Sequence, residues 1–135
     1  MSSTLNGTCL CGASTITVKN ASTEGQIKCH CKDCQLTSGT AHSSNILAKE
    51  ADVDFQGKIG RYTSKAASGN DVTRIFCTGC GSPFAHNSAV FGDSIAVQTA
   101  SLGKFHNVPY QAELFVKDRW SGIEAVKGAD QKEMA

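Results

Sequence analysis

The stretch Phe76-Cys77-Thr78-Gly79-Cys80-Gly81 contains two cysteines that are separated by two residues and followed by a glycine. Glycine permits a positive φ, so this stretch can form a tight turn whose backbone N–H groups approach both sulfurs. Such a turn is typical of a metal-binding knuckle. A redox pair is the alternative, but it needs a βαβ context, and Ser82-Pro83-Phe84-Ala85 does not favour a long helix. We therefore interpret Cys77 and Cys80 as metal ligands.

The other five cysteines of this 135-residue chain also lie in short clusters. Cys9 and Cys11 form a C-x-C pair, and Cys29, Cys31 and Cys34 form a C-x-C-x-x-C group. Cysteines this close in sequence are poor disulfide partners but good ligands for one ion, and an odd total would leave one thiol unpaired in a closed disulfide framework. Zinc prefers four tetrahedral ligands and binds thiolates well, so the pattern indicates zinc.

Seven thiolates divide naturally into one group of four and one group of three. A C-x-C pair needs a second pair to complete a tetrahedron, and the only free pair is the one in the knuckle. We therefore predict a structural zinc held by Cys9, Cys11, Cys77 and Cys80. Because metal binding contributes directly to folding, this zinc would stabilise a small core.

The remaining group, Cys29, Cys31 and Cys34, supplies three ligands, and three protein ligands with an open fourth position are typical of a catalytic zinc. A histidine that closed the site would make it structural instead. His30 is a poor candidate, because an extended backbone directs its side chain away from both neighbouring cysteines. The other histidines, which the fold would have to bring to the site, are His42, His86 and His106.

Composition and charge exclude several other functions. Lys and Arg number 13 against 12 Asp and Glu, so bulk electrostatic attraction to nucleic acid is not expected, and seven thiolates with two Zn²⁺ would make the charge more negative. No apolar run is long enough to span a membrane. Residues 1–6 lack the basic and apolar regions of a secretory signal, so we expect a cytoplasmic protein with reduced thiols.

Strand-like alternation of β-branched and polar residues dominates the chain, whereas a 3.6-residue period is scarce. We predict one mostly β domain over residues 1–126, a flexible tail over residues 127–135, a mobile loop over residues 64–71 and one short helical turn over residues 32–38. The expected strands cover residues 13–18, 26–29, 41–48, 53–55, 61–63, 72–76, 94–100 and 112–116.

The three clusters, in this order and with their flanking residues, resemble the glutathione-dependent formaldehyde-activating enzyme (GFA) family, which also contains centromere protein V. The resemblance runs from residue 7 to about residue 120. The matching stretches are Gly7-Thr8-Cys9-Leu10-Cys11-Gly12, Cys29-His30-Cys31-Lys32-Asp33-Cys34 with Ser38-Gly39, Phe76-Cys77-Thr78-Gly79-Cys80-Gly81, and Leu114-Phe115-Val116 with Trp120.

This resemblance implies a zinc-stapled, tent-like domain of two packed antiparallel sheets. It also implies a structural zinc on Cys9, Cys11, Cys77 and Cys80, and a catalytic zinc on Cys29, Cys31 and Cys34. The activity of the family is the condensation of formaldehyde with the co-substrate glutathione to S-hydroxymethylglutathione, which is classed as a carbon–sulfur lyase reaction. The implied partners are therefore a small thiol and a small aldehyde.

A zinc ion with three thiolate ligands carries a net charge of about −1, so it is a weak Lewis acid that suits a soft thiol better than a hydroxide. We hypothesise that glutathione or a similar thiol takes the fourth position and adds to, or leaves, a small carbonyl carbon. His30 or His42 would orient the reactants or transfer a proton. The alternatives are a non-enzymatic zinc module that binds a protein partner, for which no added basic segment is visible, and a redox dithiol protein.

Overall fold

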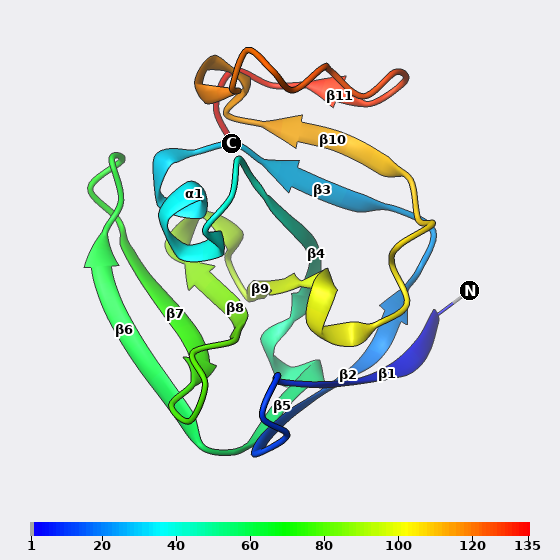
Figure 1. The fold of residues 1–135 in the computed structure, drawn as a ribbon, viewed down its shortest axis with the longest axis vertical. Helices are drawn as coiled ribbons and strands as arrows, with labels where there is room; N and C mark the ends of the chain where they lie inside the picture. The colour runs from blue at the N-terminus through cyan, green and yellow to red at the C-terminus, as the bar shows by residue number, and fades with distance from the viewer. Residues whose placement is uncertain (1) are drawn as a thin grey trace.

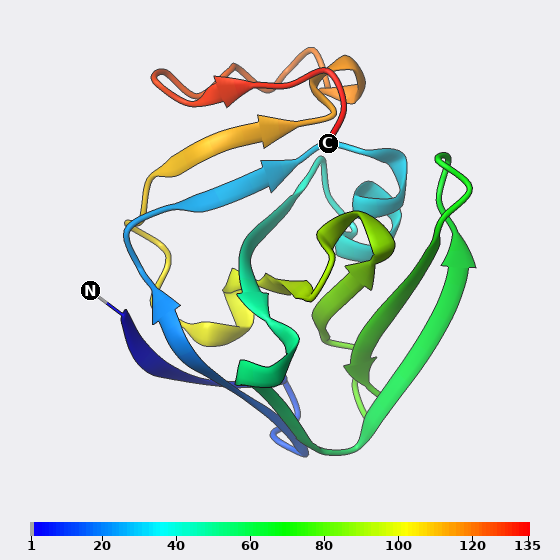
Figure 2. The same ribbon diagram turned by 180° about the vertical axis from the view of Figure 1, so that it is seen from behind.

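The computed structural model describes residues 2–135, which form two packed β-sheets (Figures 1 and 2). This confirms the mostly β, two-sheet fold expected from the sequence. The small sheet has the strand order β1-β2-β5, with β1 (Ser2–Thr8), β2 (Ser14–Ser22) and β5 (Val53–Gly57). The large sheet has the order β11-β10-β3-β4-β9-β8-β7-β6, with β11 (Asp130–Gln131), β10 (Tyr110–Leu114), β3 (Gln26–Cys29), β4 (Ser43–Lys49), β9 (Ser94–Gln98), β8 (Pro83–Ser88), β7 (Asp71–Cys77) and β6 (Ile59–Lys65).

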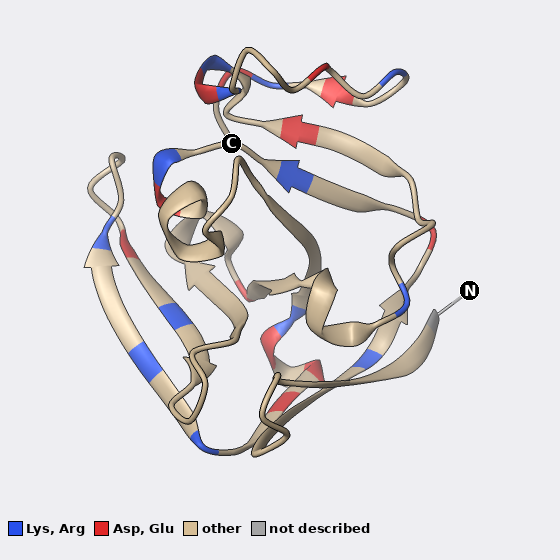
Figure 3. Cartoon of the chain, viewed as in Figure 1, with Lys and Arg blue, Asp and Glu red and all other residues tan. Residues whose placement is uncertain are grey.

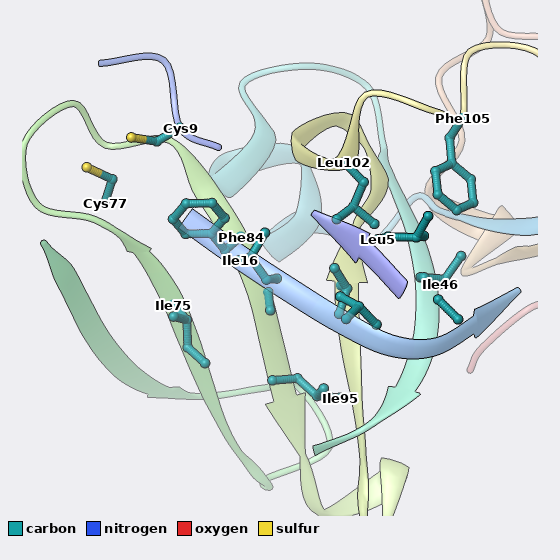
Figure 4. Close-up of a cluster of buried hydrophobic side chains, with 14 residues drawn as sticks. Leu5, Cys9, Ile16, Ile46, Ile75, Cys77, Phe84, Ile95, Leu102 and Phe105 are labelled. Atoms are coloured by element: carbon teal, nitrogen blue, oxygen red, sulfur yellow. The ribbon is translucent and has the colours of Figure 1, made fainter. Parts of the chain in front are cut away.

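The hydrophobic core lies between the two sheets (Figure 4). In β2, Ile16 and Val18 are fully buried while Lys19 is exposed, because successive side chains of a strand point to opposite faces. From the large sheet, Phe84 and Val97 are also fully buried in this cluster. Truncating one of these side chains would remove buried apolar area and leave a cavity, at a cost of about 2–5 kcal/mol.

Each strand of the large sheet presents one set of side chains to the core and a second set to the opposite face. Ile46 of β4 pairs with Val97 of β9, and both belong to the core. The next row contains Leu47 of β4, Ala96 of β9 and His86 of β8, which are neighbours in register. Because side chains alternate along a strand, this second row lies on the face that points away from the core.

Strand β10 departs from the expected antiparallel pattern, because it pairs in parallel with β3 and with β11. The large sheet is therefore mixed, and the prediction of two purely antiparallel sheets was wrong for these pairs. Parallel neighbours need a long crossover connection. Between β3 and β10 this connection contains the strands β4 to β9. Figure 1 shows β10 and β3 side by side, with the C-terminal segment beyond them.

The C-terminal residues 127–135, expected to be a flexible tail, lie along the edge of the large sheet. The backbone N–H of Lys132 donates to Glu113 O at 2.9 Å, and that of Phe115 donates to Met134 O at 3.2 Å. These bonds satisfy backbone groups of β10 that would otherwise form an open sheet edge. The pairing partners of this segment are Ala112 and Glu113 of β10, 18 residues upstream, and nothing in the composition of residues 127–135 indicated this pairing.

Short helices connect the strands. The helix α1 (Lys32–Ser38) occupies the residues expected to form a helical turn and ends at Gly39, whose φ is +72°. The expected loop over residues 64–71 is shorter than predicted, because β6 and β7 pair as far as Lys65 and Asp71. No helix within residues 2–135 is long and apolar enough to cross a bilayer. The remaining helices are 3-10 turns, η1 (Glu50–Asp52), η2 (Ala89–Phe91), η3 (Thr99–Leu102) and η4 (Val116–Asp118).

Candidate metal centres

The first candidate centre, here called the tetrad, contains Cys9, Cys11, Cys77 and Cys80. Cys9 and Cys11 lie between β1 and β2, Cys77 ends β7, and Cys80 lies in the turn before β8. All four sulfurs lie within 4.8 Å of one another, so the group could hold a metal ion. The structure thus brings together two pairs of cysteines that are 66 residues apart in sequence.

The spacing of the tetrad sulfurs fits zinc. Two Sγ atoms on a tetrahedral zinc with Zn–S bonds near 2.3 Å are separated by about 3.8 Å. In the structure, Cys11 Sγ lies 3.6 Å from Cys9 Sγ and 3.8 Å from Cys77 Sγ. A tetrahedral ion therefore requires little movement of these side chains.

Neighbouring N–H and O–H groups favour the thiolate form of two tetrad cysteines, Cys77 and Cys80. The Ser14 N–H donates to Cys9 Sγ at 3.3 Å, and the Ser14 hydroxyl donates to Cys77 Sγ at 3.2 Å. The bond from Ser14 lowers the pKa of Cys77. Hydrogen bonds from the Ser82 hydroxyl and N–H lower the pKa of Cys80 to about 5. Since metal ligands must be deprotonated, these donors favour metal binding near neutral pH.

The second candidate centre, here called the trio, contains Cys29, Cys31 and Cys34. Cys29 ends β3, Cys31 is the N-cap of α1, and Cys34 lies in the first turn of that helix. The Cys34 N–H donates to Cys31 Sγ at 3.3 Å, so the helix start itself orients one ligand. The three sulfurs lie within 4.8 Å of one another, and among the described residues no other His, Cys, Asp or Glu joins this group.

The three thiols share negative charge unequally. Hydrogen bonds from the Cys29 and Cys34 thiols, followed by the Cys34 N–H and the nearby Arg74 charge, lower the pKa of Cys31 to about 2. The same sharing with Cys31 raises the pKa of Cys29. A trio with one stable thiolate and two thiols is suited to a divalent ion, because the ion replaces the shared protons and favours all three thiolates.

His30 lies between two trio ligands but contacts a different partner. Its side chain is fully buried, and its Nε2 lies 2.7 Å from Oε1 of Glu113, which is also fully buried. Glu113 Oε2 accepts hydrogen bonds of 2.7 Å from the Val126 N–H and from Gln131 Nε2. Glu113 of β10 is in register with Lys28 of β3, and Figure 3 shows acidic colouring near the end of β10 next to basic colouring on β3. The Glu113 carboxylate therefore ties the segment carrying the trio to the C-terminal segment.

Burial alone would raise the pKa of Glu113, but hydrogen bonds from Gln131, His30 and the Val126 N–H, together with the Arg119 charge, lower it to about 2. The carboxylate is therefore charged at neutral pH in a fully buried position. The sequence analysis did not assign Glu113 a role. Its signal was a single acidic residue within an otherwise apolar expected strand, Ala112–Val116.

A comparison with family models identifies the family of the chain. The model for the glutathione-dependent formaldehyde-activating enzyme matches residues 4–118, which include both the tetrad and the trio. The chain belongs to this family. Membership agrees with the resemblance noted from the sequence.

The fold also has a counterpart among solved structures, while the search of curated proteins found no match. A Rhodobacter sphaeroides protein of known crystal structure aligns with a TM-score of 0.61 and 21% sequence identity. The alignment covers 78% of this chain and 99% of that protein. At this identity the similarity shows a shared fold.

Proposed function

We propose that this chain is a zinc-dependent carbon–sulfur lyase in which a thiol such as glutathione forms or breaks an adduct with a small aldehyde such as formaldehyde. The observation that carries the proposal is the trio, where three sulfurs converge and no fourth side chain of the described residues joins them. A zinc ion held there would supply one open position that binds an external sulfur as a thiolate. Family membership supports the same chemistry.

The residues around the trio would hold and orient the reactants. Cys29, Cys31 and Cys34 act as ligands on a framework made rigid by β3 and α1. The Gln35 amide donates to His30 O at 2.9 Å, and His30 contacts Glu113, so the ligand segment is held from both sides. We assign His30 to positioning, because it is fully buried and its Nε2 is already paired with Glu113.

The tetrad would hold a second, structural zinc. It lies where the β1–β2 connection meets the end of β7 and the turn before β8, whereas the trio lies on β3 and α1. Four ligands leave no open position for a substrate. Its proposed contribution is therefore to fold stability, while the trio carries the reaction.

The test is the Cys34→Ser variant of the zinc-loaded protein, compared with Ser38→Ala, a change at a half-buried residue of the same helix that is not a proposed ligand. We expect Cys34→Ser to contain one zinc ion instead of two and to lose glutathione-dependent turnover of the hydroxymethyl adduct by at least about 100-fold. Ser38→Ala should keep both ions and full turnover. Unchanged turnover after loss of the second zinc would refute the proposed mechanism.

A further inference from the structure

A pocket of about 140 Å³ adjoins the trio on the face of the large sheet that points away from the core. The strand register explains its lining. Ile27 precedes Cys29 by two residues on β3, so both side chains lie on one face, and Ile27 pairs with Asn45 of β4. The row of Leu47, Ala96 and His86 continues this face. The trio thus opens onto a pocket built by six neighbouring strands of the large sheet.

The lining is mainly apolar, although the charged side chains of Asp33 and Arg74 also contribute to it. Leu47, Ala96, Val72 and Leu114 supply much of the surface beside the sulfurs. Arg74 and Asp33 could pair with one carboxylate and the ammonium group of glutathione, but its second carboxylate and its peptide groups would lose hydration against the apolar part of the lining, so its peptide body does not suit this space. An apolar group is the occupant that this lining favours.

The size of the pocket sets the size of that group. A protein cavity of about 150 Å³ with apolar walls holds one benzene molecule, which has six carbon atoms. Formaldehyde has only two non-hydrogen atoms and is close in size to a water molecule, whose share of liquid volume is about 30 Å³. It would leave most of the pocket empty and would gain little from the apolar walls.

Two buried polar atoms in the lining lack partners. Asn45 is 5% exposed and His86 is 8% exposed, yet neither Asn45 Oδ1 nor His86 Nδ1 has a hydrogen-bond partner among the described residues. Both residues line the same pocket. Burial and the Arg74 charge lower the pKa of His86 to about 4, so its imidazole is neutral near pH 7. An unpaired buried polar atom is costly, and a ligand hydroxyl would satisfy either one.

We propose that this pocket binds the apolar substituent of an aldehyde with about six carbon atoms, and that such an aldehyde, not formaldehyde, is the preferred carbonyl substrate. The inference rests on the proposed function, because it places the carbonyl carbon beside a sulfur at the trio. In the reaction, the thiol sulfur and the carbonyl carbon form a bond, the C=O π bond becomes an alkoxide, and the proton released by the thiol returns to that oxygen. The new hydroxyl is the group that Asn45 and His86 can bind.

The first experiment measures binding without reaction. Calorimetric titration of the zinc-loaded protein compares hexan-1-ol with methanol, since both carry a hydroxyl but cannot form the adduct. Burial of the additional methylene groups predicts that hexan-1-ol binds at least about 100-fold more tightly, with a negative heat-capacity change. Equal affinities for the two alcohols would overturn the inference.

A matched pair of variants tests whether hexan-1-ol binds in this pocket. Leu47 lines the pocket and is 51% exposed, whereas Leu36 is 75% exposed on α1 and does not line it. We expect Leu47→Ser to weaken hexan-1-ol binding about tenfold and Leu36→Ser to leave it unchanged. Both side chains are exposed enough for the variants to fold. Equal effects of the two substitutions would overturn the assignment to this pocket.

The second experiment separates the substrate class from the proposed function. Rates above the uncatalysed background are measured for glutathione with hexanal, for glutathione with formaldehyde, and for hexane-1-thiol with formaldehyde. The inference predicts that kcat/KM for hexanal exceeds that for formaldehyde by at least about 100-fold. Equal values, or a preference for the apolar thiol, would overturn it while the proposed function stands. Tight hexan-1-ol binding without turnover of any pair would support the pocket and refute the lyase function.

Discussion

Replacement of Glu113 by glutamine tests the role of the buried carboxylate behind the trio. The substitution keeps the shape of the side chain but removes the charge that the Val126 N–H, Gln131 and His30 stabilise. The pKa of Glu113 is lowered from its ordinary value of 4.5 to about 2 in the folded protein. At about 1.4 kcal/mol per pH unit, this lowered pKa corresponds to about 3 kcal/mol of stability at neutral pH.

The sign of the pH dependence follows from the lowered pKa. The contribution of Glu113 is complete above its unfolded value near 4.5 and is lost as the pH falls toward about 2. Urea unfolding of the wild type and of Glu113→Gln should therefore differ by about 3 kcal/mol at pH 7, and the difference should shrink below pH 4.5. Zinc release in acid affects both proteins, so the difference between them isolates the carboxylate.

Glu124→Gln is the matched control, because Glu124 is an exposed acid of the same C-terminal segment. Its effect should stay within about 0.5 kcal/mol at every pH. The reasoning fails if Glu113→Gln is as stable as the wild type at pH 7. It also fails if the loss has the same size at pH 7 and at pH 3, because the charge would then not be its cause.

Two further predictions concern the tetrad and its surroundings. Cys11 is exposed, so Cys11→Ser creates no cavity. With zinc present, the variant should lower the free energy of unfolding by up to about 4 kcal/mol, the value for closing a 66-residue loop, and in excess chelator it should not change that free energy. Urea unfolding under both conditions measures the difference, and an equal loss with and without zinc would contradict a metal ion that links the two cysteine pairs. Gly57 has a φ of +98°, and a Cβ there would lie 2.0 Å from Ala13 O, so Gly57→Ala should lower the thermal midpoint by more than Gly69→Ala, whose φ is +88° in open space. Equal midpoints for the two glycine variants would show that the contact beside the tetrad relaxes freely.

Both cysteine clusters could be predicted from the sequence, for different reasons. The trio spans six residues, so almost any local conformation keeps Cys29, Cys31 and Cys34 close together. The tetrad joins pairs 66 residues apart, and its composition followed from counting ligands per zinc ion. The number of ligands that zinc requires therefore predicted a contact between distant segments, which the pattern of hydrophobic residues does not predict.

The faces of the large sheet could not be predicted in the same way. Ile46 and Leu47 are adjacent apolar residues, yet Ile46 is 6% exposed in the core while Leu47 is 51% exposed at the pocket. A continuous apolar run does not show which face is covered. The pocket beside the trio was therefore absent from the sequence analysis, which named His86 only as a possible zinc ligand and did not name Asn45.

Besides β11, the sequence analysis did not predict β1 and β8, because the residues of these two strands do not alternate clearly between apolar and polar. Strand β1 has Leu5 as its one buried large apolar residue, and β8 begins with Pro83, which is unfavourable inside a sheet. Both strands adjoin the tetrad cysteines, and their pairing with β2 and β7 positions those ligands. The contact between His30 and Glu113, 83 residues apart, likewise depends on the parallel pairing of β3 with β10.

X-ray absorption at the zinc edge, recorded with and without glutathione, tests the central claim that the trio binds an ion incompletely. The account predicts two zinc ions per chain, one with four sulfur ligands in both states and one that changes from three sulfur ligands to four when glutathione is added. A single zinc ion, or a second ion whose ligands are the same in both states, would contradict it.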